Sequence, residues 1–169
     1  MHALIVVATR HGSTLEIGQE IGVGLAEAGV PAEIRGPDEI ETLDAVDAVI
    51  VGSAVYAGQW LGGAKAFVER FTPELRDRPV WLFSSGPLGD PPMPAADPAG
   101  VAPLIERIAP RAHRVFAGRL ARHDLGVMEK VMVAAVHAPD GDFRDRGAAR
   151  AWGLEIGAAL QSTSAAARA

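Results

Sequence analysis

The chain has 169 residues and a mass of 17.6 kDa, the size of one ordinary domain. Cysteine is absent, which excludes disulfides, thiolate nucleophiles and cysteine-ligated metal clusters. The formal net charge of −5 argues against general nucleic-acid binding. No apolar run approaches the roughly 18 residues that span a bilayer, and no basic region precedes the first one. We therefore expect a cytoplasmic protein without a secretory signal.

Charge is distributed unevenly along the chain. Residues 1–103 carry 6 basic and 14 acidic side chains, a net −8, whereas residues 104–169 carry 10 and 7, a net +3. Solvated helix faces would explain this imbalance. A basic surface that meets an acidic partner or lipid headgroups would also explain it.

The first elements alternate between short apolar runs and a helical stripe. Residues 3–8 form a continuous apolar run, which predicts a strand buried on both faces. Apolar residues then recur at every fourth position from Ile17 to Leu25, which predicts one buried face of a helix. Residues 31–35 predict a second strand, and the acidic stretch 38–44 a loop or a poor helix. Three small residues would let the first helix lie close to the sheet: Gly18, Gly22 and Gly24.

The same alternation continues to the end of the chain. Further strands are predicted at residues 48–52, 79–84 and 114–117, and helices at 65–71, 101–108 and 142–160. Alternating buried strands and helices indicate one α/β domain over residues 1–169, with a doubly wound parallel sheet and helices on both faces. The proline-rich stretch 86–100 is either a long, stiff loop or a disordered segment, and loops of that length are often functional lids.

A doubly wound sheet binds its ligand outside the carboxyl ends of its strands, where the strand order reverses. The loop after the first strand is therefore a candidate site. Its amides and hydroxyls, with the positive end of the following helix, suit a phosphate. Simple capping of that helix by a hydroxyl is the alternative, and the loop lacks the P-loop lysine. The residues concerned are Thr9, Arg10, His11, Gly12, Ser13 and Thr14.

The loops after the third and fourth strands complete the candidate site. The former holds two aromatic residues among small neighbours, which leaves room for a flat ring to approach. The alternative is that both aromatics fold back onto the core. The loop after the fourth strand has backbone amides beside glycines, which could bind the polar edge of such a ring. This pattern is weak, because serine, glycine and proline occur in most turns. The residues are Ser53, Ala54, Val55, Tyr56, Ala57, Gly58 and Trp60 in one loop, and Ser84, Ser85, Gly86 and Gly89 in the other.

On these residues the sequence resembles the flavodoxin family. Thr9, Gly12 and Thr14 match that family's phosphate loop, whereas His11 and Ser13 replace its usual hydroxyl residue and asparagine. The likeness is closest to the flavodoxin-domain group that contains menaquinone-dependent protoporphyrinogen dehydrogenase, and it extends to residues 8–14, 51–56 and 141–145. The resemblance implies a flavodoxin-like, five-stranded parallel sheet in the order 2-1-3-4-5. It also implies one FMN, with its phosphate on the first loop and its ring between the other two loops, stacked on Tyr56 or Trp60.

The resemblance further implies an FMN-dependent oxidoreductase that transfers electrons or hydride. Its partner would be a redox protein or a small molecule such as a quinone or porphyrinogen, and a quinone would require transient contact with a membrane. No catalytic side chain is assigned, because the flavin carries the chemistry. No metal site is assigned either, because His113, His123 and His137 are too scattered.

Three alternative functions differ from this prediction. The first is an electron shuttle, a flavodoxin proper. The second is a flavodoxin-like domain that has lost FMN and serves as a binding module. The third is a signalling domain of the response-regulator type, which requires an acidic pocket after the first strand. Thr9, Arg10 and His11 stand there instead, and the two basic residues would repel Mg²⁺.

Overall fold

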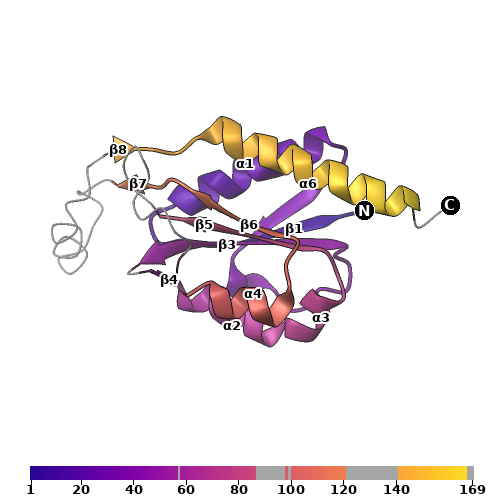
Figure 1. Cartoon of the computed structure of the whole chain (residues 1–169), viewed down its shortest axis with the longest axis horizontal. Coiled ribbons are helices and arrows are strands. Elements are labelled where there is room, and N and C mark those ends of the chain that lie inside the picture. The colour runs from indigo at the N-terminus through magenta and orange to yellow at the C-terminus, as the bar shows by residue number, and fades with distance from the viewer. Residues whose placement is uncertain (57, 87–97, 99, 121–140, 167–169) are drawn as a thin grey trace.

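A central sheet separates two layers of helices (Figure 1). The computed structural model describes residues 1–56, 58–86, 98, 100–120 and 141–166. Helices α1 and α6 cover one face of the sheet, and α2, α3 and α4 cover the other (Figure 1). The elements are β1 (Ala3–Ala8), α1 (Ser13–Glu27), β2 (Ala32–Arg35), the 3₁₀ turn η1 (Pro37–Glu39), β3 (Ala48–Tyr56), β4 (Gln59–Trp60), α2 (Gly62–Arg70), α3 (Thr72–Arg76), β5 (Val80–Ser85), α4 (Ala102–Ile108), β6 (Ala112–Phe116), β7 (Arg119–Leu120), β8 (Gly141–Asp142) and α6 (Arg146–Ala166).

The strand order is β2-β1-β3-β5-β6, and all four pairings in this path are parallel. Since β5 and β6 are the fourth and fifth strands of that path, the expected order 2-1-3-4-5 is confirmed. Every residue of β1 is buried, as its apolar run predicted. Alternate side chains of β1 enter the two cores, with Leu4 and Val6 on the α2 side and Ile5 and Val7 on the α1 side.

The third strand is longer than the sequence predicted. It runs to Tyr56 rather than ending at residue 52, because Ser53 and Ala54 continue the parallel ladder with β5. Val55 and Tyr56 then pair antiparallel with β4, so the expected loop at 53–60 is largely a hairpin. The sequence did not predict this extension, because it begins with Ser53 and Ala54, two residue types with little preference for strands.

The predicted last helix begins later than expected, at Arg146 rather than at residue 142. Gly141–Asp142 instead forms strand β8, which pairs antiparallel with β7. The helix starts where Asp145 Oδ1 accepts a hydrogen bond of 2.8 Å from the Ala148 N–H, a capping contact. The other predicted helices and strands differ from the structure by a few residues at their ends, whereas α3, β4 and β7 were not predicted. The acidic stretch 38–44 forms no α-helix.

Helices α1 and α6 approach each other at glycine positions. A Cβ on Gly24 would lie 2.1 Å from the Arg150 carbonyl oxygen, and one on Gly153 would lie 2.2 Å from the Ile21 carbonyl oxygen. Gly18 faces the sheet as expected, since its Cβ would lie 2.9 Å from Val7 Cγ2. The glycines of α1 thus serve two contacts, one with the sheet and one with α6.

An ion pair joins the same two helices at their surface. Arg150 binds the carboxylate of Glu27, with Nε 3.0 Å from Oε2. The hydrogen bond from this guanidinium holds the pKa of Glu27 below its ordinary value. Among the helices built from the described residues, none is both long enough and apolar enough to cross a membrane.

Replacing Gly24 by alanine should destabilise the fold by about 1–3 kcal/mol, because the added methyl group meets backbone that cannot move aside. Urea unfolding of the variant and the native chain measures this. Gly62→Ala is the matched control: its Cβ would meet no described atom within 4 Å, so its unfolding free energy should change by less than about 1 kcal/mol. Equal stability of G24A and the native chain would contradict the close helix contact.

Candidate functional site

The sheet register brings the three predicted loops to one edge. Ala8 of β1 pairs with Ser53 of β3, and Ser53 pairs with Ser84 of β5. The loops that follow β1 and β5 therefore begin side by side at one edge of the sheet. The hairpin that extends β3 lies between them at the same edge. Strand order reverses between β1 and β3, because β2 lies beyond β1 and β5 lies beyond β3. This is the position at which doubly wound sheets bind ligands.

The first loop turns at Gly12, which has φ 80° and directly precedes α1. This left-handed conformation strains any residue with a side chain. The Gly12 N–H donates to Thr9 Oγ1 over 3.1 Å, which holds the turn closed. The N-cap residue of α1 is Gly12 itself, which has no side chain to cap the helix. Apart from its chain neighbours, no described heavy atom lies within 4 Å of the place a Gly12 Cβ would take.

Helix capping by Ser13 or Thr14, the alternative explanation of this loop, is not what the structure shows. Ser13 and Thr14 are already the first residues of α1, and Thr14 is buried. A helix start without a side-chain cap leaves N–H donors and a positive dipole end for an anion. The first loop is therefore shaped for a phosphate-like group.

A contact between Arg10 and Tyr56 joins the first loop to the hairpin. Arg10 Cζ lies 4.8 Å from the centroid of the Tyr56 ring, within the range of a cation–π interaction. Tyr56 is half-buried and Arg10 is exposed. The Tyr56 ring is thus the candidate stacking surface at this edge, and a ligand that stacks on the face under Arg10 must displace that side chain.

Trp60 points into the protein instead. Its ring is only 2% exposed and packs in the core on the α2 side of the sheet. The indole Nε1–H donates to Ser84 Oγ over 2.8 Å, and the same oxygen lies 2.8 Å from His113 Nε2. Trp60 as a stacking partner is therefore wrong for this structure, because its hydrogen bond and its packing hold the ring in the core.

The hydroxyls of Ser53 and Ser84 also face inward. Ser53 Oγ donates to the Ala54 carbonyl oxygen over 2.9 Å and accepts the Leu61 N–H over 3.0 Å. Both serines are fully buried, and Ala54 and Ser85 are nearly so. These hydroxyls stabilise the sheet edge and the start of α2. The described conformation does not present them to a ligand.

The third loop leaves β5 close to β3. A Cβ on Gly86 would lie 2.9 Å from Val55 Cβ, so this position needs a glycine for packing. The Gly86 N–H donates to the Phe116 carbonyl oxygen over 3.4 Å. Gly58 turns the hairpin with φ 73°. Two predicted site residues, Ala57 and Gly89, lie outside the described residues.

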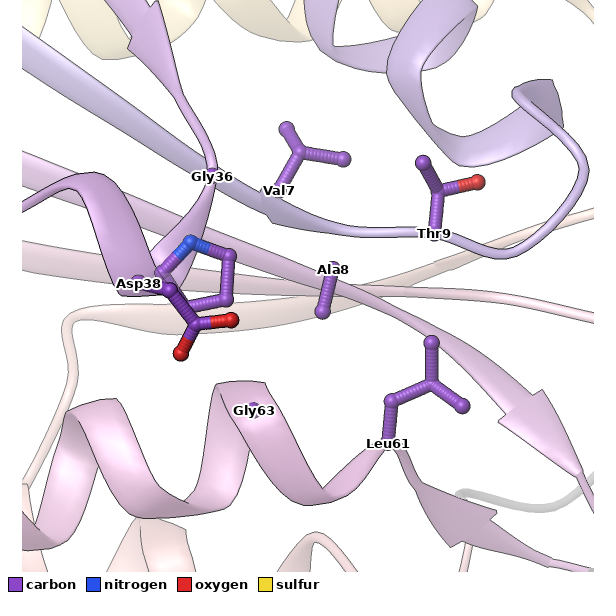
Figure 2. Close-up of a pocket in the computed structure, with 8 residues that line it drawn as sticks. Val7, Ala8, Thr9, Gly36, Asp38, Leu61 and Gly63 are labelled. Carbon is purple, nitrogen blue, oxygen red and sulfur yellow. The ribbon is translucent and has the colours of Figure 1, made fainter.

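A pocket of about 380 Å³ lies beside the first loop, between η1 and the start of α2 (Figure 2). Val7 and Thr9 point to the α1 side of β1, whereas Ala8 points to the α2 side (Figure 2). No sequence pattern predicts this pocket, because its side next to β2 is an ordinary turn of glycine, proline and aspartate. Its lining residues are Val7, Ala8, Thr9, Gly36, Pro37, Asp38, Leu61 and Gly63. Within the described part of the chain, no cluster of histidine and acidic residues is placed to hold a metal ion.

Comparison with known proteins identifies the family. A model of the flavodoxin domain matches residues 4–146, which is most of the chain. The chain belongs to the flavodoxin-domain family. Among curated relatives, protoporphyrinogen IX dehydrogenase [quinone] of Escherichia coli K12 is 28% identical over 86 residues, which is 50% of this chain and 48% of that protein. The chain thus spans about half the length of the curated relatives it matches.

Solved structures of flavodoxins share the fold over nearly the whole chain. A flavodoxin from the domain Archaea superposes with a TM-score of 0.67 at 14% identity, covering 95% of this chain and 99% of that one. A WrbA-like flavodoxin from Agrobacterium tumefaciens gives 0.62 at 13% identity, covering 95% and 98%. At such low identity these structures establish the flavodoxin fold alone.

Ser84→Ala should lower the free energy of unfolding by about 1–3 kcal/mol, because the buried Trp60 N–H loses its acceptor. Affinity for the expected FMN should stay unchanged, since the hydroxyl faces the core. Denaturant unfolding and flavin titration measure the two effects. Ser162→Ala, which removes an exposed hydroxyl on α6, should leave both unchanged. Loss of flavin affinity in S84A at native stability would show that the Ser84 hydroxyl reaches the ligand.

Proposed function

We propose that this flavodoxin-domain protein binds one FMN at the carboxyl edge of its sheet and passes electrons or hydride between a donor and an acceptor. The observation that carries the proposal is the start of α1 at Gly12, a left-handed glycine with open space where a Cβ would stand, at the switch point of the sheet. Members of the flavodoxin family typically bind FMN. When bound, FMN supplies the electron or hydride transfer, and the protein binds, orients and shields it.

The first loop fits a phosphate in shape and charge. Thr9 holds the turn by accepting the Gly12 N–H, and the open space over Gly12 allows an anion to approach the backbone. Amides at a helix start bind dianions through direct hydrogen bonds and through the helix dipole. Arg10 and His11 are exposed beside this turn, so the loop places basic side chains near the phosphate position.

Tyr56 supports a position for the flavin ring beside the hairpin. It is half-buried and lies next to the first loop through its contact with Arg10. We infer that Arg10 moves from the Tyr56 ring when the flavin stacks there, and that its charge then lies near the phosphate. A flat ring and a guanidinium compete for the same aromatic face, because both bind its π-electrons.

Two functions remain for such a flavoprotein, and each has support. The sequence likeness to a quinone-dependent protoporphyrinogen dehydrogenase favours an enzyme whose acceptor is a quinone and whose donor is of the porphyrinogen class. The flavodoxin-domain match over residues 4–146 is equally compatible with an electron shuttle. We favour the enzyme, because the likeness in sequence is to a dehydrogenase, whereas the likeness to solved flavodoxins concerns the fold.

Steady-state turnover distinguishes the two functions. The FMN-loaded protein should oxidise protoporphyrinogen with a water-soluble menaquinone analogue at a rate well above that of free FMN at equal concentration. Absorbance of the oxidised porphyrin measures the rate. Absence of turnover, together with rapid reduction by a flavodoxin reductase, would assign the shuttle function instead.

Gly12→Val combined with Thr14→Ala should weaken FMN binding more than tenfold, on the order of 1.4 kcal/mol or greater. The reason is that the branched side chain strains the left-handed turn and covers the approach to the amides. Quenching of flavin fluorescence measures the affinity.

The matched control is Gly29→Val, at the opposite end of α1. Gly29 has a nearly equal φ of 77°, so the substitution imposes similar backbone strain far from the site. It should reduce stability without reducing FMN affinity. Unchanged FMN affinity in the first-loop variant would place the phosphate elsewhere. A colourless native protein that takes up no FMN would favour a domain that has lost its cofactor.

A further inference from the structure

An ion cluster joins the first turn of α1 to the segment between β8 and α6. Arg144 forms a two-pronged contact with Asp142, with Nε 2.7 Å from Oδ1 and Nη2 2.6 Å from Oδ2. Arg144 Nη1 also lies 2.8 Å from Glu16 Oε2. The Arg144 side chain is only 3% exposed, which is unusual for a charged residue.

Glu16 is the acidic residue closest to the phosphate-binding turn within α1. It lies in the first turn of the helix, and its N–H donates to the Gly12 carbonyl oxygen over 3.1 Å. A carboxylate at this position stabilises the helix through its dipole. The same carboxylate repels a dianion that binds at the same helix end, so its charge must be offset if a phosphate is to bind tightly.

Arg144 is well suited to offset that charge. Its hydrogen bonds with Asp142, and after them its pairing with Glu16, raise the pKa of a guanidinium that is already ionised at neutral pH. Because the side chain is almost fully buried, water and salt screen its pairing with Glu16 less than they would at the surface. The bond with Asp142 fixes the direction of the guanidinium, and the guanidinium fixes the Glu16 carboxylate.

We propose that Arg144 is a positioning residue for the phosphate site, which neutralises Glu16 and holds its carboxylate so that a dianion can bind at Gly12. This inference rests on the proposed function, since it concerns the phosphate of the bound FMN. Arg144 acts through Glu16. The chemical group recognised is a phosphate monoester, and a flavin without phosphate should not sense the residue.

Arg146 provides a matched comparison. Its Nη2 lies 2.9 Å from the same Oε2 of Glu16, but its side chain is 59% exposed. Exposed ion pairs contribute little because solvent screens them and the side chain loses entropy. If burial gives the pairing its effect, the loss of Arg144 should matter and the loss of Arg146 should not.

The experiment compares FMN with riboflavin, which has the same ring and no phosphate, in titrations of the full chain. Arg144→Gln should weaken FMN binding on the order of tenfold, because Glu16 then repels the phosphate, and leave riboflavin binding unchanged. Arg146→Gln should keep FMN affinity within about threefold of the native value. The double variant Arg144→Gln with Glu16→Gln should recover part of the lost affinity, because the carboxylate in the first turn of α1 is gone while Asp142 stays without its guanidinium.

The outcomes separate this inference from the proposed function. Absence of FMN binding by the native chain overturns both. Native FMN binding with an unaffected R144Q overturns the role of Arg144 alone, as does an equal loss of FMN and riboflavin, which would show a structural role. Failure of the double variant to recover FMN affinity also overturns it. If R144Q does not fold, Glu16→Gln alone decides: it should bind FMN at least as tightly as the native chain, and weaker binding contradicts the proposal.

Discussion

The hydrogen-bond register among β1, β3 and β5 is the constraint on which the candidate site depends. Ala8, Ser53 and Ser84 stand in line across three parallel strands, so the segments that follow them meet at one edge. Two apolar cores, one on each face of the sheet, hold this register. A slip of one residue would exchange the faces of every side chain in a strand, so burial on both sides fixes the edge firmly.

Polar groups at this edge divide into those used by the fold and those left for a ligand. The hydroxyls of Ser53 and Ser84 bind Leu61 and Trp60, and burying them unpaired would be costly. The N-cap residue of α1 is Gly12, which has no side chain of its own to cap the helix, and Tyr56 is only half-buried. The site thus consists of a backbone anion position and one aromatic face.

Electrostatic pairing between α1 and the segment around the start of α6 accounts for part of the charge asymmetry along the sequence. Arg144 and Arg146 bind Glu16, and Arg150 binds Glu27. These basic residues of the C-terminal part therefore form ion pairs with acidic residues of the N-terminal part. Such internal pairing removes the need for an acidic partner to explain these three charges. It also connects the first turn of α1 with the β7–β8 ribbon, since Arg144 lies two residues after the end of β8.

The sequence by itself determined the features that depend on neighbouring residues. The buried run at residues 3–8, the stripe from Ile17 to Leu25 and the glycine turn before α1 are local patterns, so they were predicted correctly. Three features depend instead on partners far along the chain. They are the inward orientation of Trp60, the extension of β3 to Tyr56 and the burial of Arg144 against Glu16. Only the tertiary structure decided these, because packing and hydrogen bonding between distant segments determine which side chains are buried.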